Sequence, residues 1–189
     1  DTVKKIGGNA IKTSKTHETG TDRIFEVFKE SLDCNPNLIV NLQGDMPNIQ
    51  PQAIKDLIIY MEQSQCDIGT LASEINSNSE LENKDVVKVI VKDRLKSGMF
   101  CEALDFLRTR PNTQNKIYHH IGIYAFTSKA LMKYVSLSRS KLEIDRRLEQ
   151  LRAMENGMSI HVGYINSSPL SVDTEKDLLE VKKLMEKND

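Results

Sequence analysis

The feature of this sequence that most constrains its fold is a regular alternation of short β-branched runs with helical patterns. The clearest strand is 86–92, which is dominated by valine and isoleucine, and Pro51 favours a helix from its own position to about residue 65. Further strands are predicted at 9–13, 37–42, 68–75, 117–126 and 159–165, and further helices at 21–32, 128–135, 142–156 and 175–187. This alternation predicts an α/β fold with a largely parallel sheet.

Size and composition narrow the class of protein. The 189 residues are 39% hydrophobic and 28% charged, which predicts one ordinary globular domain over residues 1–189. The net charge is −1 without a basic run, so neither nucleic acid nor a membrane is expected as a partner. Cys34, Cys66 and Cys101 are scattered and predict free thiols in a reducing cytoplasm, not disulfides or a zinc site.

Two aspartates, Asp45 and Asp173, stand at positions where a carboxylate could bind a ligand. Gln43-Gly44-Asp45 comes directly after a strand, and α/β sheets bind ligands beyond the carboxyl ends of their strands. Asp173 precedes Thr174 and the last helix. Each aspartate could equally be a helix cap. If the two converged, their carboxylates would suit Mg²⁺.

Three other segments carry polar side chains that could serve a site. Residues 17–23 open a helix with Gly20 and hydroxyl groups, which can bind an anion or form a plain cap. His120 in a strand is either packed in the core or turned into a cleft. In residues 148–152, Glu149 and Arg152 are predicted to pair at i,i+3, or Glu149 and Gln150 could bind sugar hydroxyls. No signature of a covalent hydrolase occurs.

Taken in order, five blocks of the sequence resemble the CMP-Kdo synthetase family, the 3-deoxy-manno-octulosonate cytidylyltransferases. The blocks are residues 17–23, 41–45 with Pro47, 120–124, 148–152, and 172–174 with Asp177 and Leu178. The resemblance covers essentially the whole chain. It implies a Rossmann-like nucleotidyltransferase fold with a mostly parallel sheet, and a homodimer formed through an insert at roughly 86–126.

The resemblance also implies a reaction and a set of site residues. A hydroxyl of Kdo, the sugar acid, would attack CTP with Mg²⁺ present, giving CMP-Kdo and diphosphate for lipopolysaccharide synthesis in the cytoplasm. Asp45 and Asp173 would be the catalytic, Mg²⁺-binding carboxylates. The sugar would be bound by Gln43, Arg108, His120, Tyr124, Glu149 and Gln150. The nucleotide would be bound by His17, Thr19, Gly20, Thr21 and Arg23.

The sequence departs from the family pattern in several places. Met46 replaces a usual Glu, residues 103–108 match only loosely around Arg108, and Arg146-Arg147 stands where an acid and an apolar residue are usual. The N-terminal βαβ unit and its basic CTP-binding loop have no counterpart, so the chain alone is expected to turn over weakly or not at all. The alternatives are a sialic acid cytidylyltransferase and a non-catalytic binding or assembly module.

Overall fold

The computed structural model describes residues 2–30, 36–166, 168–172 and 174–186. The helices are α1 (Thr2–Lys5), α2 (Gly20–Glu30), α3 (Pro51–Gln63), α4 (Asn78–Glu82), α5 (Ser128–Ser136), α6 (Lys141–Arg146), α7 (Gln150–Glu155) and α8 (Glu175–Met185). The strands are β1 (Leu38–Asn41), β2 (Ile68–Ser73), β3 (Lys88–Val91), β4 (Phe100–Leu107), β5 (Lys116–Thr127) and β6 (Ile160–Tyr164).

The described strands form a mixed sheet that closes on itself. Their order is β1-β5-β2-β6-β4-β3, and β3 also pairs with β5, which completes a ring that leaves β1 outside it. Only the β2–β6 pairing is parallel, and the other pairings between strands are antiparallel. The α/β class is confirmed, but the prediction of a mostly parallel sheet is wrong.

The reason lies in β4 and β5, because every antiparallel pairing between the described strands involves one of these two. No element was predicted at β4. The strands β3, β4 and β5 follow one another without an intervening helix. Both β4 and β5 pair antiparallel with β3, so these two strands run in the same direction on either side of β3. Only Ala103 and Phe106 of β4 are buried, and this weak alternation is why the strand escaped prediction.

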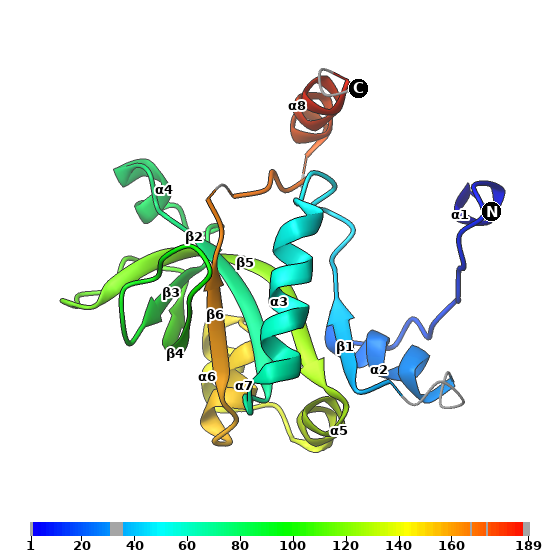
Figure 1. Cartoon of the computed structure of the whole chain (residues 1–189), viewed down its shortest axis with the longest axis horizontal. Coiled ribbons are helices and arrows are strands. Elements are labelled where there is room, and N and C mark those ends of the chain that lie inside the picture. The colour runs from blue at the N-terminus through cyan, green and yellow to red at the C-terminus, as the bar shows by residue number, and fades with distance from the viewer. Residues whose placement is uncertain (1, 31–35, 167, 173, 187–189) are drawn as a thin grey trace.

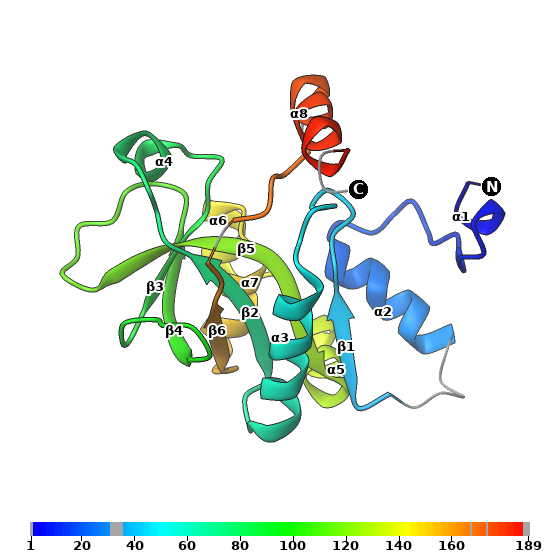
Figure 2. The ribbon, with the colours of Figure 1, turned by 45° about the horizontal axis from the view of Figure 1, so that its top comes forward.

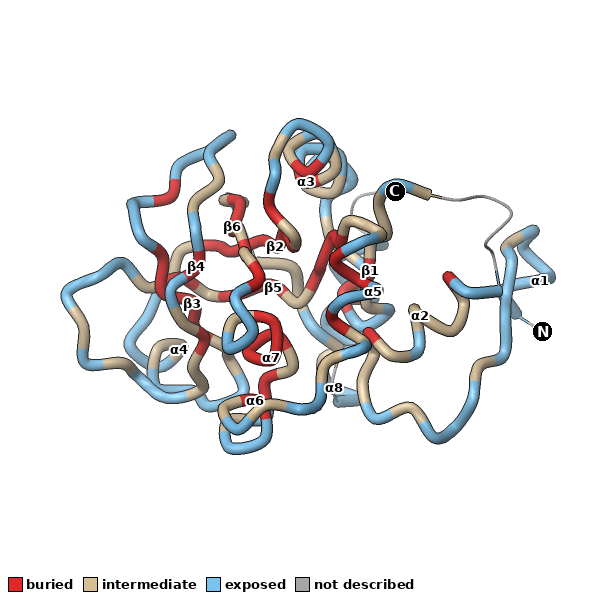
Figure 3. Tube along the Cα trace, turned by 90° about the horizontal axis from the view of Figure 1, so that it is seen from below, coloured by how far each residue is buried: buried red, intermediate tan, exposed pale blue. Residues whose placement is uncertain are grey.

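Helices cover both faces of the sheet (Figures 1 and 2). On one face α3 packs Leu57 and Met61 against β2, so closely that a Cβ on Gly69 would lie 2.7 Å from Met61 Sδ. On the other face α5 and α7 contribute Leu131, Tyr134 and Leu151 to the larger core. Figure 3 shows the buried residues concentrated in the sheet and in these helices.

Three local predictions are corrected by the structure. Residues 9–13 form no strand. The predicted helix 142–156 is two helices, because Arg147 ends α6 in the left-handed conformation with φ 54°. The helix predicted from residue 21 begins at Gly20 and is capped by Thr19, whose hydroxyl accepts a hydrogen bond from the backbone N–H of Asp22 at 3.2 Å.

The two ends of the described chain lie at the periphery. The helix α1, with no buried residue, lies to one side of the sheet, and α8 stands off the body after the segment that follows β6 (Figure 1). Cys66 and Cys101 are free thiols, whereas Cys34 lies outside the described residues. Among the described helices, none has the length and apolarity to cross a membrane.

Candidate active site

A large cleft of about 1060 Å³ gathers residues from distant parts of the chain. It lies between the loop after β1, the segment around α4, the middle of β5, the α6–α7 junction and residues 166 and 168–171. Seven of the predicted site residues border it: Gln43, Asp45, Arg108, His120, Tyr124, Glu149 and Gln150. The fold therefore brings together side chains that are up to 107 positions apart, from Gln43 to Gln150.

Two of the predicted nucleotide-binding residues, Gly20 and Thr21, lie next to residues that line the cleft. A Cβ on Gly20 would lie 3.1 Å from Gln43 Nε2, and Thr21 lines a small hollow together with Glu149 and Gln150. Thus α2 begins directly against the cleft wall. None of the five predicted nucleotide residues lines the cleft itself.

The side chains of His17 and Arg23 are occupied within their own segment. His17 Nε2 pairs with Glu26, and Arg23 donates to Thr13 and to the carbonyl oxygen of Ser14. The hydrogen bonds between Glu26 and His17 and between Glu26 and Ser14 lower the pKa of the Glu26 carboxyl. These contacts fasten residues 13–17 to α2.

Asp45 is exposed at the cleft and is held through its backbone. The backbone N–H of Val172 donates to the Asp45 carbonyl oxygen at 2.9 Å, and the N–H of Leu170 donates to Asn48 Oδ1, also at 2.9 Å. The segment leading to α8 therefore lies against the loop after β1. Asp173 lies outside the described residues, so its predicted role stays a prediction.

His120 is buried and stays neutral at physiological pH. Its Nε2 lies 2.9 Å from Thr70 Oγ1, which is also 2.7 Å from the carbonyl oxygen of Ile123. Thr70 has one hydroxyl hydrogen, which it donates to the carbonyl oxygen of Ile123. His120 therefore donates to Thr70 through Nε2, and its Nδ1 is left as an acceptor. Burial, with a smaller effect of His119, lowers the pKa of His120 to about 3.

Glu149 and Gln150 present two buried polar atoms that have no partner among the described residues. These atoms are Glu149 Oε2, an acceptor, and Gln150 Nε2, a donor. Burial raises the pKa of Glu149, and the neighbouring side chains of Thr21 and Thr19 partly oppose that rise. Since buried polar groups are normally paired, this adjacent acceptor and donor are available to a ligand with hydroxyl groups.

The wall that carries Glu149 is fixed by a buried ion pair. Arg152 donates two hydrogen bonds to the Glu143 carboxylate, at 2.8 and 2.6 Å, and its guanidinium stacks on Tyr134. The predicted pairing of Glu149 with Arg152 is therefore wrong, because the break at Arg147 turns α7 back against α6. Burial alone would raise the pKa of Glu143, but the hydrogen bonds with Arg152 and Ser140 lower it overall.

Arg108 is held at the cleft by backbone contacts. Its guanidinium donates to the carbonyl oxygens of Lys84 at 3.2 Å and Arg147 at 3.4 Å. The fully buried Lys88 donates in turn to the carbonyl oxygens of Arg108 at 3.0 Å and Val86 at 2.8 Å. Burial lowers the pKa of Lys88. A buried ammonium thus connects the end of β4 to the segment before β3.

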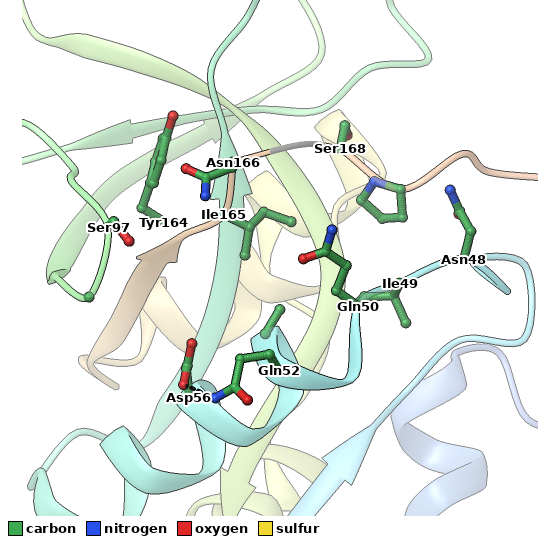
Figure 4. Close-up of a pocket in the computed structure, with 13 residues that line it drawn as sticks. Asn48, Ile49, Gln50, Gln52, Asp56, Ser97, Tyr164, Ile165, Asn166 and Ser168 are labelled. Atoms are coloured by element: carbon green, nitrogen blue, oxygen red, sulfur yellow. Dashed lines mark hydrogen bonds between the residues drawn. The ribbon is translucent and has the colours of Figure 1, made fainter. Parts of the chain in front are cut away.

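A smaller pocket of about 240 Å³ is lined in part by residues 164–166, 168 and 169 (Figure 4). Its walls are the start of α3, the turn at Ser97 and the end of β6. Gln52 and Asp56 are joined there by a hydrogen bond of 2.7 Å. Asn166 borders both this pocket and the cleft, so one stretch of chain separates the two.

The sequence analysis missed several residues that border the cleft, among them Glu80, His119, Arg147 and Ser168. His119 Nδ1 lies 2.7 Å from Glu80 Oε1. Strict strand alternation would place only one of two adjacent histidines on a given face. A register shift in the β2–β5 pairing near Thr70 loosens this rule. The adjacent pair of histidines was the only sequence signal for His119.

Comparisons with known proteins agree with this geometry. Residues 1–160 match the family described as cytidylyltransferase. The 3-deoxy-manno-octulosonate cytidylyltransferase of Rhizobium etli is 40% identical, covering 98% of this chain and 74% of that protein. The enzyme of the same name from Bartonella tribocorum is 41% identical, covering 97% of this chain and 75% of that protein.

Solved structures give the same result. A structure described as CMP:2-keto-3-deoxy-manno-octonic acid synthetase complexed with CTP has a TM-score of 0.87 and 32% identity, covering 99% of this chain and 76% of that one. An apo UDP-glucose pyrophosphorylase has a TM-score of 0.65 at 11% identity, covering 96% of this chain and 64% of that one, and this shows a shared fold alone. The family match and these relatives together show that the chain belongs to the cytidylyltransferase family of nucleotidyltransferase enzymes.

Proposed function

We propose that this protein transfers a cytidylyl group from CTP to 3-deoxy-manno-octulosonate, the sugar acid Kdo, and releases diphosphate. The observation that carries the proposal is the unpartnered acceptor and donor of Glu149 and Gln150 at a cleft that also holds Arg108. A polyhydroxy acid offers hydroxyls to the first two and a carboxylate to the third. The names of the relatives support the same substrates.

In this proposal, an anomeric hydroxyl of the sugar acid attacks the α-phosphorus of CTP. The new P–O bond forms while the bond to the β-phosphate oxygen breaks, diphosphate leaves, and the hydroxyl proton passes to solvent. Glu149 accepts from a sugar hydroxyl and Gln150 donates to another. The neutral His120 offers Nδ1 as a further acceptor. The chain mainly positions the two substrates, and positioning can supply much of the rate acceleration.

Asp45 offers the cleft one carboxylate for a magnesium ion, and the described residues contain no cluster of three potential metal ligands. Asp45 is exposed there, and its carboxylate pairs with no cation in the described part of the chain. Mg²⁺ is typically held by one or two protein carboxylates together with substrate phosphate oxygens. When bound, Mg²⁺ would neutralise charge on the phosphates. We assign Asp45, and with it Asp173, to this ion.

A competition assay tests the substrate. The purified protein is supplied with CTP, Mg²⁺ and equal amounts of Kdo and sialic acid, and the products are identified by mass spectrometry. CMP-Kdo is the expected product. A predominance of CMP-sialic acid would contradict the proposal, and a protein that binds neither CTP nor Kdo would favour a non-catalytic binding or assembly module.

A matched pair of variants tests the residues. Glu149→Gln is expected to raise KM for Kdo about tenfold, because it replaces a charged acceptor by a neutral amide. Glu62→Gln makes the same change on the exposed face of α3, away from the cleft, and should leave KM unchanged. Equal effects in the two variants would count against the assignment.

The assembly and the cellular location follow from the same proposal. A homodimer formed through residues 86–126 would use the segment that holds β3, β4 and most of β5. Light scattering coupled to gel filtration would give twice the mass of one chain if this holds, and the mass of one chain if it does not. A cytoplasmic enzyme feeding lipopolysaccharide synthesis is the corresponding setting.

A further inference from the structure

Arg147 occupies an unusual position at the cleft. It ends α6 with φ 54° and ψ 49°, and it is the one non-glycine residue with positive φ in the described ranges. This left-handed conformation is unfavourable for a side chain with a Cβ, and glycine is the usual residue at such helix ends. Arg147 nevertheless keeps a long cationic side chain at this point of the cleft wall.

The guanidinium of Arg147 differs from those of the neighbouring arginines in that no described carboxylate pairs with it. Arg139 and Arg152 both pair with Glu143, and Arg146 pairs with Asp105 at 2.6 Å. For Arg147, the described part of the chain provides no ion pair and no side-chain hydrogen bond.

Arg108 is also without a carboxylate partner in the described structure. It contacts Arg147 directly, because its Nη2 donates to the Arg147 carbonyl oxygen at 3.4 Å. The acidic residue Glu80 of the same cleft is engaged with His119. The cleft wall therefore holds two adjacent arginines whose charges are not neutralised by the protein.

We propose that Arg147 is a second binding residue for the carboxylate of the sugar acid, acting beside Arg108. The proposal rests on the proposed function and extends its site. Two guanidinium groups on one carboxylate give charge-assisted hydrogen bonds of fixed geometry. The sugar carboxylate is favoured over the nucleotide phosphates, because Arg147 borders the cleft with Glu149 and Gln150, whereas residues 17–23 do not border it.

The test compares Kdo with its carboxamide, in which the carboxylate is replaced by a neutral amide. Arg147→Gly keeps the left-handed turn and removes the charge. Equilibrium binding should show about tenfold weaker binding of Kdo, with carboxamide binding unchanged. Arg147→Lys should restore part of the affinity for Kdo.

The matched control is Arg110→Gly, which removes an exposed arginine that pairs with Glu82 outside the cleft lining. It should leave the affinity for both ligands unchanged. A purely structural role for Arg147 would weaken the binding of Kdo and of the carboxamide equally in Arg147→Gly, and that result would overturn the proposal.

Three other outcomes are informative. Loss of CTP affinity in Arg147→Gly with normal Kdo affinity would overturn the assignment to the sugar acid. If the unmodified protein binds Kdo and Arg147→Gly binds it equally well, only this inference fails. If the unmodified protein binds neither Kdo nor CTP, the proposed function fails and this inference with it.

Discussion

The two walls of the cleft are built in different ways. The α6–α7 wall, residues 147–150 with Arg108, is backed by the buried Glu143–Arg152 pair and by the buried Lys88. The Asp45 wall, residues 43–48 with 168–172, buries Met46 in the smaller core, and its two segments are joined by single hydrogen bonds such as that from the Val172 N–H to the Asp45 carbonyl oxygen. The proposed sugar-binding residues Arg108, Glu149 and Gln150 thus lie on a wall fixed before binding, whereas Asp45, the proposed metal ligand, lies on a more exposed wall.

The largest expected effect comes from the base of the α6–α7 wall. Glu143→Gln removes the carboxylate that binds the buried Arg152 and leaves it only Asp22, at 4.0 Å, and breaking a buried pair typically costs about 3–5 kcal/mol of unfolding free energy. Urea denaturation measures this loss. Asp145→Asn on the same helix breaks only the exposed pair with Lys141 and should change stability by less than about 0.5 kcal/mol. Similar losses in both variants would refute the contrast between the walls.

The next effect concerns the Asp45 wall and is catalytic rather than structural. Asp45→Asn should reduce kcat at least about 100-fold, because it weakens the proposed magnesium site, while the melting temperature stays unchanged. Asp56→Asn, at the smaller pocket, is the matched control and should retain activity. A full rate in Asp45→Asn would remove Asp45 from the mechanism.

A pH titration tests the buried, neutral state of His120. The unfolded chain binds a proton at His120 near pH 6.5, whereas the native protein does so only at about pH 3. Between these values the unfolded state holds more protons, so stability falls as the pH drops below about 6.5. The slope should approach about 1.4 kcal/mol per pH unit, and above pH 6.5 this contribution is constant.

The control for this titration is His120→Gln, which removes the titrating group. Its unfolding free energy should depend less steeply on pH between about 6.5 and 4 than that of the unmodified protein. Identical slopes would mean that His120 is not the neutral buried histidine described above.

The smallest effect is expected at the break between α6 and α7. Arg147→Gly removes the strain of a left-handed non-glycine residue and should raise the unfolding free energy by about 0.5–1 kcal/mol. Thermal unfolding measures the change. A clear loss of stability would show that the Arg147 side chain supports the wall instead of facing a ligand.

Much of the secondary structure could be predicted, because hydrophobic periodicity and the residues that begin or end a helix or strand are found within the element itself. Pro51 at the first position of α3 and the β-branched residues of β3 are such cases. β4 could not be found this way, since few of its residues are buried. The break at Arg147 was also hidden, because neither glycine nor proline marks it. Because one continuous helix was expected, Arg152 was predicted to pair with Glu149, whereas it pairs with Glu143.

The sequence by itself determined the class of elements, the family and seven residues that border one cleft. Tertiary structure decided the antiparallel pairings, the closure of β3 onto β5 and the partner of each charged residue. It also placed Arg147 and His119 at the cleft. The physical reason is that periodicity records which face of an element is buried, whereas strand direction and ion pairing depend on segments far away in the chain.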